Sequence, residues 1–155
     1  MINCQSIRNK KSELRECAEY IKPDIIIACE SWLSSEHKNA EIFPDGYKTN
    51  VYRKDRNKNG GGVFITIHDR FKTNAVESGD NKCELAWAEV QTDAKSVIIG
   101  SFYRPPNSNP ETLQELRTSI EKIKQNSKTK PIILAGDFNL PHIDWDNNTV
   151  KPGAN

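Results

Sequence analysis

The sequence lacks the features that mark several large classes of protein. No apolar stretch is long enough to span a membrane, and the opening residues Met1–Cys4 do not form a signal peptide. The net charge is only +1, which excludes the global basic field that drives nonspecific nucleic-acid binding. No internal repeat or linker divides residues 1–155, which predicts a single domain. We therefore expect an intracellular protein, in the cytoplasm or the nucleus, that binds any nucleic acid through a local patch.

Two familiar motifs are also missing. The four cysteines form no Cys-x-x-Cys pair, and most of them fall in apolar or helical contexts, so we expect reduced core thiols. These are Cys4, Cys17, Cys29 and Cys83. The three glycines at 60–62 are followed by a predicted strand and not by Lys-Ser/Thr and a helix, which excludes a phosphate-binding P-loop. Their simplest interpretation is the turn of a β-hairpin.

What the sequence does contain is a set of short apolar runs that end in polar residues. Ile132–Ala135 predicts a strand buried on both faces of a sheet. Asp137 and Asn139 follow it and alternate with Phe138, so both can point to the same side of the strand end. A carboxylate can orient water or bind a hard metal, and an amide can bind a phosphate oxygen. The alternative is that residues 136–139 form only a turn.

A second apolar run has the same design. Ile25–Cys29 predicts another fully buried strand, and it ends at Glu30. Because ligand-binding residues of open α/β sheets gather at strand ends, we expect Glu30 and Asp137 to lie close together. The alternative is a strand-end charge that reaches solvent, although Ser31–Leu33 does not have the composition of an exposed turn.

The remaining pattern predicts a mixture of helices and strands. Amphipathic helices are expected at Ser12–Lys22 and from Asn109 to Gln125, with a polar loop at residues 34–46 and no pattern after residue 145. Strands are expected at Tyr47–Lys54, Val63–Ile67, Glu84–Gln91 and Val97–Tyr103, in two antiparallel pairs.

Two strand ends carry groups that suit a phosphate. The last predicted pair ends at Tyr103 and Arg104, where a phenol and a guanidinium stand side by side before two prolines. Tyr103 can also be explained as plain core. Four Lys or Arg residues between positions 53 and 58 form a basic tip, which is either a solvated turn or a contact to a phosphate backbone.

Five phrases now occur in an order that resembles a known superfamily. They are Asn-Cys-Gln-Ser-Ile-Arg-Asn-Lys, Pro-Asp-Ile-Ile-Ile-Ala-Cys-Glu-Ser-Trp-Leu, Gly-Gly-Gly-Val, Phe-Tyr-Arg-Pro-Pro and Gly-Asp-Phe-Asn-Leu-Pro-His-Ile-Asp-Trp. From Asn3 to about Trp145 the chain resembles the endonuclease/exonuclease/phosphatase superfamily, and within it the N-terminal endonuclease of non-LTR retrotransposons of the Jockey and chicken-repeat kind.

The resemblance implies an α/β fold, a four-layer sandwich of two β-sheets flanked by helices, and a phosphodiesterase site that uses Mg²⁺ (or Mn²⁺). It implies that Glu30 binds the metal with Asn3 close by. By the same resemblance Asp137 orients and deprotonates the attacking water, Asn139 holds the water or the phosphate, and Tyr103 hydrogen-bonds a phosphate oxygen. The implied substrate is DNA, and the implied parent protein carries a downstream reverse transcriptase.

The sequence also departs from the superfamily. The late Ser-Asp-His motif, whose His stabilises the transition state, is absent, and His142 does not match its pattern. We therefore expect a domain that is incomplete at its C-terminus, lacks its final strands, exposes apolar surface on one side and has impaired endonuclease activity. The alternatives are a noncatalytic remnant that binds Mg²⁺ or nucleic acid weakly, and a phosphatase or sphingomyelinase-like relative of the same superfamily.

Overall fold

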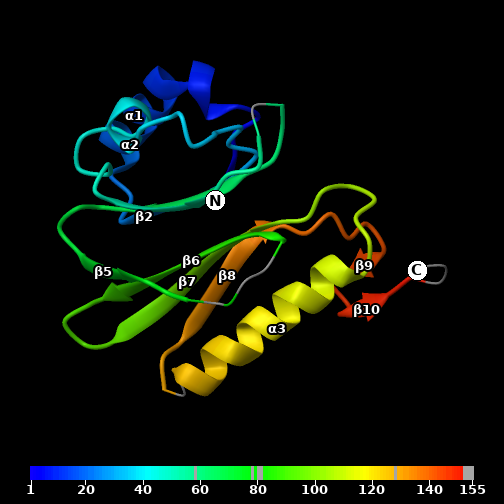
Figure 1. Cartoon of the computed structure of the whole chain (residues 1–155). Helices are drawn as coiled ribbons and strands as arrows, with labels where there is room; N and C mark the ends of the chain where they lie inside the picture. The colour runs from blue at the N-terminus through cyan, green and yellow to red at the C-terminus, as the bar shows by residue number, and fades with distance from the viewer. Residues whose placement is uncertain (58, 78, 80–81, 128, 152–155) are drawn as a thin grey trace.

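The chain folds into two stacked β-sheets with helices on both outer faces, as the computed structural model shows (Figure 1). The structure describes residues 1–57, 59–77, 79, 82–127 and 129–151. Helices α1 (Lys11–Ile21) and α2 (Asn39–Ile42) lie over one sheet, and α3 (Glu111–Asn126) lies over the other. The layers therefore run helix, sheet, sheet, helix, and the predicted four-layer α/β sandwich is confirmed.

The first sheet is built from the N-terminal half of the chain. Its strands, in spatial order, are β1 (Ile2–Asn3), β2 (Ile25–Cys29), β4 (Val63–Ile67) and β3 (Asn50–Lys54). β1 runs parallel to β2, and the other neighbours are antiparallel. The predicted hairpin across the three glycines is confirmed, although β3 begins at Asn50 and not at Tyr47. A 3-10 turn, η1 (Ile7–Asn9), leads from β1 to α1.

The second sheet follows along the chain. Its strands, in spatial order, are β5 (Lys72–Ala75), β6 (Glu84–Gln91), β7 (Ser96–Tyr103) and β8 (Ile132–Asp137). The antiparallel pairing of β6 with β7 is confirmed, and β8 runs parallel to β7 because α3 forms the crossover between them. Two short strands, β9 (Ile143–Asp144) and β10 (Thr149–Val150), form a separate hairpin.

The two sheets stack with matching edges. β2 packs over β7 and β8, while β3 packs over β6. β1 and β8 are therefore the edge strands on the same side of the sandwich. The core lies in three apolar clusters: one under α1 that contains Leu14 and Phe64, one between the sheets that contains Ile65 and Ala88, and one under α3 that contains Trp87.

The structure corrects the prediction that the Ile132–Ala135 strand is buried on both faces. β8 is an edge strand, and Ile133 is 52% exposed. Ile132 and Leu134 pack with the cluster under α3, so Ile133 points to the opposite face, toward the open side between the sheets. The apolar run predicted the strand correctly but did not reveal that it has a neighbour on one side only.

Other elements escaped the sequence analysis. α2 lies inside the stretch of residues 34–46 that was expected to be a polar loop, β5 was not expected at all, and β10 falls in the tail where no pattern was found. All three are four residues long or shorter, and such elements have too few positions for a periodic pattern. The residues at 152–155 lie outside the described part of the chain.

All four cysteines are free, and all but Cys17 are buried. Burial raises the pKa of the Cys4 thiol to about 12, as expected for an unreactive core thiol. Within the described ranges, no helix combines the length and the apolar composition needed to cross a membrane.

Candidate active site

The candidate site begins with a row of three side chains at one end of the second sheet. The register of β7 and β8 places Tyr103 beside Asp137, and the register of β6 and β7 places Glu84 on the other side of Tyr103. Paired residues on neighbouring strands point to the same face of a sheet. Because Tyr103 packs in the cluster between the sheets, the row faces the first sheet.

Glu30 reaches this row from the first sheet. It directly follows β2, and its carboxylate lies near enough to the Tyr103 hydroxyl for hydrogen bonding between them to shift the pKa of both groups. The structure therefore brings Glu30, Tyr103 and Asp137 together, as the strand ends suggested. The reason differs from the expected one, because β2 and β8 belong to different sheets and meet through the stacking of the sandwich.

The Glu30 carboxylate is held by several donors. Its Oε2 accepts from the Trp32 indole Nε1 at 2.5 Å and from the Gly61 backbone N–H at 2.9 Å. Burial raises the pKa of Glu30, but the hydrogen bonds from Tyr103, Gly61 and Trp32 outweigh it, so the pKa lies below its ordinary value. Burial and the hydrogen bond to Glu30 raise the pKa of Tyr103. At neutral pH the pair is a carboxylate and a neutral phenol.

The three glycines at 60–62 do more than close a hairpin. The Gly61 N–H donates to Glu30, while the next N–H, that of Gly62, donates to Oε2 of Glu84. Arg56 completes the arrangement by donating from Nη1 to Glu84 Oε1 and from Nε to the Gly60 carbonyl, each at 3.0 Å. A Cβ on Gly61 would lie 2.4 Å from Glu84 Oε2, and the φ of Gly61 is 69°, so only glycine fits there.

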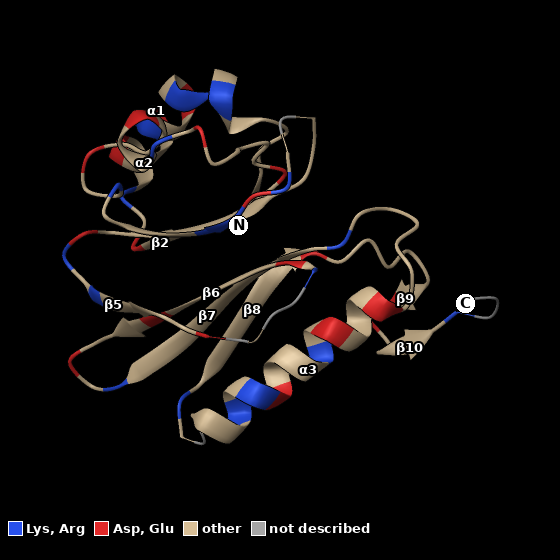
Figure 2. Cartoon of the chain, in the orientation of Figure 1, with Lys and Arg blue, Asp and Glu red and all other residues tan. Residues whose placement is uncertain are grey.

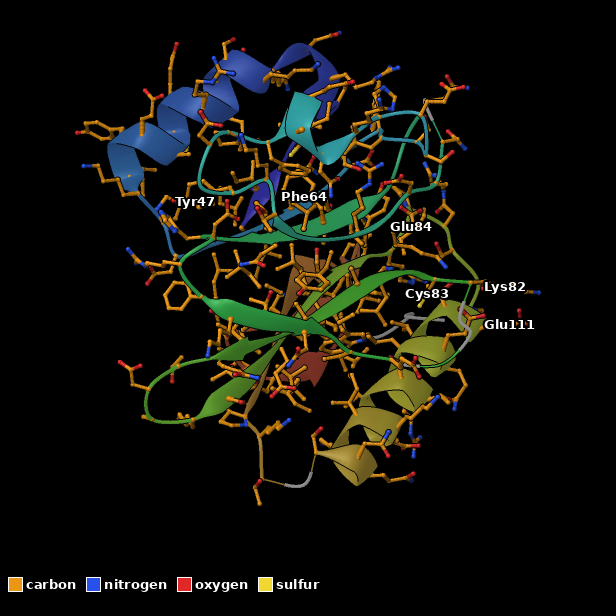
Figure 3. All side chains as sticks on the ribbon, turned by 60° about the vertical axis from the view of Figure 1, so that its left-hand side comes forward. Tyr47, Phe64, Lys82, Cys83, Glu84 and Glu111 are labelled. Atoms are coloured by element: carbon orange, nitrogen blue, oxygen red, sulfur yellow. The ribbon has the colours of Figure 1, made fainter. Side chains whose placement is uncertain are left out.

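Glu84 is the site residue that the sequence analysis missed. It is 7% exposed, and Figure 3 shows it at the start of β6, at the end of the sandwich where the loops gather. Burial raises the pKa of Glu84, against the hydrogen bond from Gly62 and the charge of Arg56. The only sequence signal for Glu84 was its charge at the first position of a predicted apolar strand. Charged residues are also common at strand ends that have no function.

Asp137 and Asn139 are linked to each other and to Arg104. Oδ1 of Asp137 accepts from the Asn139 backbone N–H at 3.1 Å, and the Asn139 side-chain amide donates to the Arg104 carbonyl at 2.7 Å. The Arg104 guanidinium donates to the carbonyls of Asn139 at 3.0 Å and Ser108 at 2.7 Å. Arg104 therefore braces the loop after β8, and its direct contact with a substrate stays a prediction.

Asn3 lies at the edge of this group. It pairs with Cys29 across the parallel strands β1 and β2, one position before Glu30, and it is exposed. Its Oδ1 accepts a hydrogen bond from the Gln5 N–H at 3.3 Å. Burial raises the pKa of Cys29 to about 11, and the charges of Asp137, Glu30 and Glu84 add to this shift. All three acidic groups therefore lie near Cys29.

A divalent cation fits this set of donors only as a weakly held ion. Among the described residues no three His, Cys, Asp or Glu side chains cluster tightly enough to form a full protein cage. Mg²⁺ does not require one, because it keeps several waters and binds through one or two carboxylates together with substrate phosphate. Oε2 of Glu30 accepts hydrogen bonds from the Gly61 backbone and the Trp32 indole. The side-chain oxygens of Glu30 and Asn3 are hard ligands of the type that Mg²⁺ and Mn²⁺ prefer.

Charge does not single out one face of the protein. Figure 2 shows acidic and basic residues intermixed on α1 and α3. Two arginines of the basic tip after β3 bind groups within the protein. Arg53 donates hydrogen bonds to the carbonyls of Ser34 and His37, and Arg56 donates to the Glu84 carboxylate. Of the two interpretations of this tip, a solvated turn or a contact to a phosphate backbone, the second therefore loses two of its cations to contacts within the protein. Lys58 lies outside the described residues.

The three histidines have local partners of their own. His37 hydrogen-bonds Ser34, His68 packs its ring against Tyr47, and His142 lies in the turn before β9, where its carbonyl accepts from Lys151. That none of them replaces the missing Ser-Asp-His motif stays a prediction.

Comparisons with known proteins support the resemblance stated above. The family model for endonuclease-reverse transcriptase matches residues 97–154. Over 137 residues the chain is 25% identical to an RNA-directed DNA polymerase from the mobile element jockey of Drosophila funebris. The alignment covers 88% of this chain and 14% of that protein. A DNA-(apurinic or apyrimidinic site) endonuclease of Dictyostelium discoideum is 24% identical, with 88% of this chain and 39% of that protein covered.

Solved structures support the same fold. The endonuclease domain of TRAS1, a telomere-specific non-LTR retrotransposon, matches with a TM-score of 0.63 at 18% identity, covering 89% of this chain and 57% of that chain. A 3′-5′ exonuclease from Neisseria meningitidis matches with a TM-score of 0.60 at 16% identity, covering 90% and 57%. The chain therefore spans less than two thirds of the proteins it matches. It resembles the endonuclease/exonuclease/phosphatase superfamily and, within it, the endonuclease domains of retrotransposons.

Proposed function

We propose that this domain hydrolyses phosphodiester bonds of DNA with the help of a divalent cation. The observation that carries the proposal is the meeting of Glu30 and Asp137, from two different sheets, next to Tyr103. Two carboxylates and a neutral hydrogen-bond donor at one strand edge suit phosphoryl chemistry, in which negative charge must be neutralised and a water oriented. The names of the jockey and TRAS1 relatives favour DNA as the substrate and a reverse transcriptase as a partner domain of the same polyprotein.

The metal belongs beside Glu30 in this proposal. Glu30 and Asn3 would hold Mg²⁺ or Mn²⁺, and the ion would supply positive charge to a phosphate oxygen. The lowered pKa keeps Glu30 ionised throughout the neutral range, as a metal ligand must be. The donors on Oε2 fix the direction of the carboxylate before any ion arrives.

The other residues act on the water and the phosphate. Asp137 accepts a proton from the attacking water while the water oxygen bonds to phosphorus. The bond from phosphorus to the leaving oxygen breaks, and the leaving oxygen takes up a proton from solvent. The backbone N–H of Asn139 donates to Asp137, which keeps the two residues together. We assign the Asn139 side chain to bind the attacking water or the phosphate. The Tyr103 hydroxyl remains protonated, and we assign it to exchange its partner Glu30 for a phosphate oxygen when DNA binds.

We further propose that the 155-residue chain hydrolyses DNA slowly. In the superfamily it resembles, a His of the Ser-Asp-His motif stabilises the transition state, and the present sequence has no such motif. Loss of one positioned donor of this kind typically reduces the rate by about 10²- to 10³-fold. Binding of metal without hydrolysis would identify the noncatalytic remnant instead.

The test is supercoiled-plasmid nicking in Mg²⁺ and in Mn²⁺, with enzyme in excess so that slow cleavage is visible. We expect weak nicking by the wild-type chain and at least a further ~10²-fold loss in Asp137→Asn and in Glu30→Gln. Glu89→Gln is the matched control, because Glu89 lies on β6 toward the other end from Glu84 and pairs with Lys130. Nicking that is equal in all four proteins would be a contaminant's and would reject the assignment.

A further inference from the structure

We infer that Glu84 is a positioning residue. It holds the glycine turn in place, and the glycine turn then fixes the metal-binding carboxylate of Glu30. The inference rests on the proposed function for the role of Glu30. It concerns a residue that lies outside the set expected from the family resemblance and that touches neither of the groups assigned to the reacting water.

The inference starts from the backbone of the three glycines. Three of their backbone groups are held by three different side chains: the Gly60 carbonyl by Arg56, the Gly61 N–H by Glu30, and the Gly62 N–H by Glu84. Two consecutive amides therefore donate to two carboxylates that come from different sheets. Displacement of one carboxylate must move the peptide that binds the other.

Glu84 is the central support of this arrangement. Its two oxygens take different donors, with Oε1 bound by Arg56 and Oε2 by Gly62, so one carboxylate fixes both the turn and the arginine that braces the turn. The other backbone contacts of the turn run to the segment after Glu30: the N–H groups of Ser31 and Trp32 donate to the carbonyls of Gly62 and Gly61. The turn and the Glu30 loop are thus bound to each other on both sides.

The chemistry of Glu84 favours a functional reason for its presence. A carboxylate that is 7% exposed must give up most of its hydration, and a well-packed apolar residue at such a position is commonly at least as stable as a buried ion pair. Stability alone therefore does not explain a charge here. Groups that hold a metal ligand in place from behind typically contribute about 10- to 100-fold in metal affinity or activity when they are removed.

The experiment compares Glu84→Gln with wild type, with Glu30→Gln and with the control Glu89→Gln. Mn²⁺ binding is measured by the loss of the free-ion signal in electron paramagnetic resonance. We expect Glu84→Gln to weaken Mn²⁺ binding by about 10-fold or more, Glu30→Gln to remove the site, and Glu89→Gln to bind as wild type does. Unchanged Mn²⁺ affinity in Glu84→Gln would overturn the inference.

A second measurement follows the contact itself, without metal. The Trp32 indole N–H donates to Glu30, so its ¹H–¹⁵N resonance reports where that carboxylate lies, and Trp32→Phe identifies it among the three tryptophans. We expect this resonance to move in Glu84→Gln toward its position in Glu30→Gln. The Trp87 indole N–H donates to the Ser119 hydroxyl of α3. Its resonance should not move, which would show that the fold is intact.

The two measurements separate the inference from the proposed function. If wild type and Glu30→Gln bind Mn²⁺ alike, the metal site is wrong, and the Trp32 resonance alone then decides whether Glu84 positions Glu30. A Trp32 resonance that does not move in Glu84→Gln overturns the inference in either case. If Glu84→Gln does not fold, Arg56→Lys replaces it; it removes the Nε contact to the Gly60 carbonyl and should shift the same resonance in the same direction by less.

Discussion

β2 and β8 are similar in sequence and different in surroundings. Both are short apolar strands, and each leads to a carboxylate of the candidate site, Glu30 in one case and Asp137 in the other. β2 lies between β1 and β4, whereas β8 has β7 as its only partner among the described strands. Ile26 in β2 is 4% exposed, and Ile133 in β8 is 52% exposed. An apolar run therefore predicts a strand without predicting how many neighbours it has.

The same difference reaches the site. At the end of β2, the Glu30 carboxylate is enclosed by donors from Tyr103, Trp32 and Gly61. At the end of β8, the Asp137 carboxylate accepts a hydrogen bond from the N–H of Asn139, in its own loop. The two halves of the site are thus braced to different degrees, and four predictions test how far this contrast extends.

The largest effect should appear when the same substitution is made in both strands. Ile26→Ala removes a fully buried side chain from the cluster under α1 and should lower the free energy of unfolding by about 2–5 kcal/mol. Ile133→Ala removes a half-exposed one and should cost about 1 kcal/mol or less. Urea unfolding followed by circular dichroism measures both. Equal losses would mean that β8 is covered in solution.

The next effect concerns the end of β8 that carries Asp137. A Cβ added at Gly136 would lie 1.8 Å from the Phe102 carbonyl oxygen, which belongs to the backbone of β7 and cannot move like a side chain. Gly136→Ala should therefore force β7 and β8 apart next to the site, with a loss of about 1–3 kcal/mol in the free energy of unfolding. Plasmid nicking should fall as Asp137 is displaced. Ile133→Ala is the control within the same strand, and Gly136→Ala should cost more than it does.

The sequence predicted the long elements and the site residues that terminate them. β6, β7 and the β3–β4 pairing follow from alternation and from the turn glycines, and Tyr103 and Asp137 were expected at strand ends because polar residues directly follow or close apolar runs. Such signals are local. They require only that neighbouring positions share one strand or one helix face.

The parts that were missed depend on contacts between distant positions. Glu84 and Gly62 lie 22 positions apart, and Glu30 and Gly61 lie 31 apart, so no local pattern announces that one glycine turn receives two carboxylates. The exposure of Ile133 was missed for the same reason, since it depends on which strand forms the edge of the sheet. β5 has no apolar alternation and is defined by its pairing with β6.

The third prediction uses pH to compare the two carboxylates at the glycine turn, and its effect should be smaller than that of the core substitutions. The pKa of Glu30 is lowered in the folded state, so Glu30 contributes stability above the ordinary value of 4.5 that is lost as pH falls through its folded pKa. The pKa of Glu84 is raised, so Glu84 contributes stability below 4.5 that is lost as pH rises through its folded pKa.

The variants should therefore respond to pH with opposite signs. Relative to wild type, Glu30→Gln should become less stable as pH rises from about 3 to about 5, while Glu84→Gln should become more stable as pH rises above about 4.5. Urea unfolding at a series of pH values measures both differences. Parallel curves for the two variants would show that the two carboxylates share one environment.

The smallest effect on stability is expected for Ile133→Lys, although its effect on association should be clear. A lysine at a position that is 52% exposed loses little packing, so the free energy of unfolding should change by about 0.5 kcal/mol or less. β8 is uncharged from Ile132 to Gly136, and an uncharged edge strand with exposed apolar side chains is a site for strand-to-strand association. The positive charge should suppress such association, as edge lysines do in natural sheets. Sedimentation velocity over a concentration series compares the wild type with Ile133→Lys and with Lys72→Ala, a control on the opposite edge strand β5. A wild-type chain that stays monomeric at all concentrations would show that the β8 edge does not associate in solution.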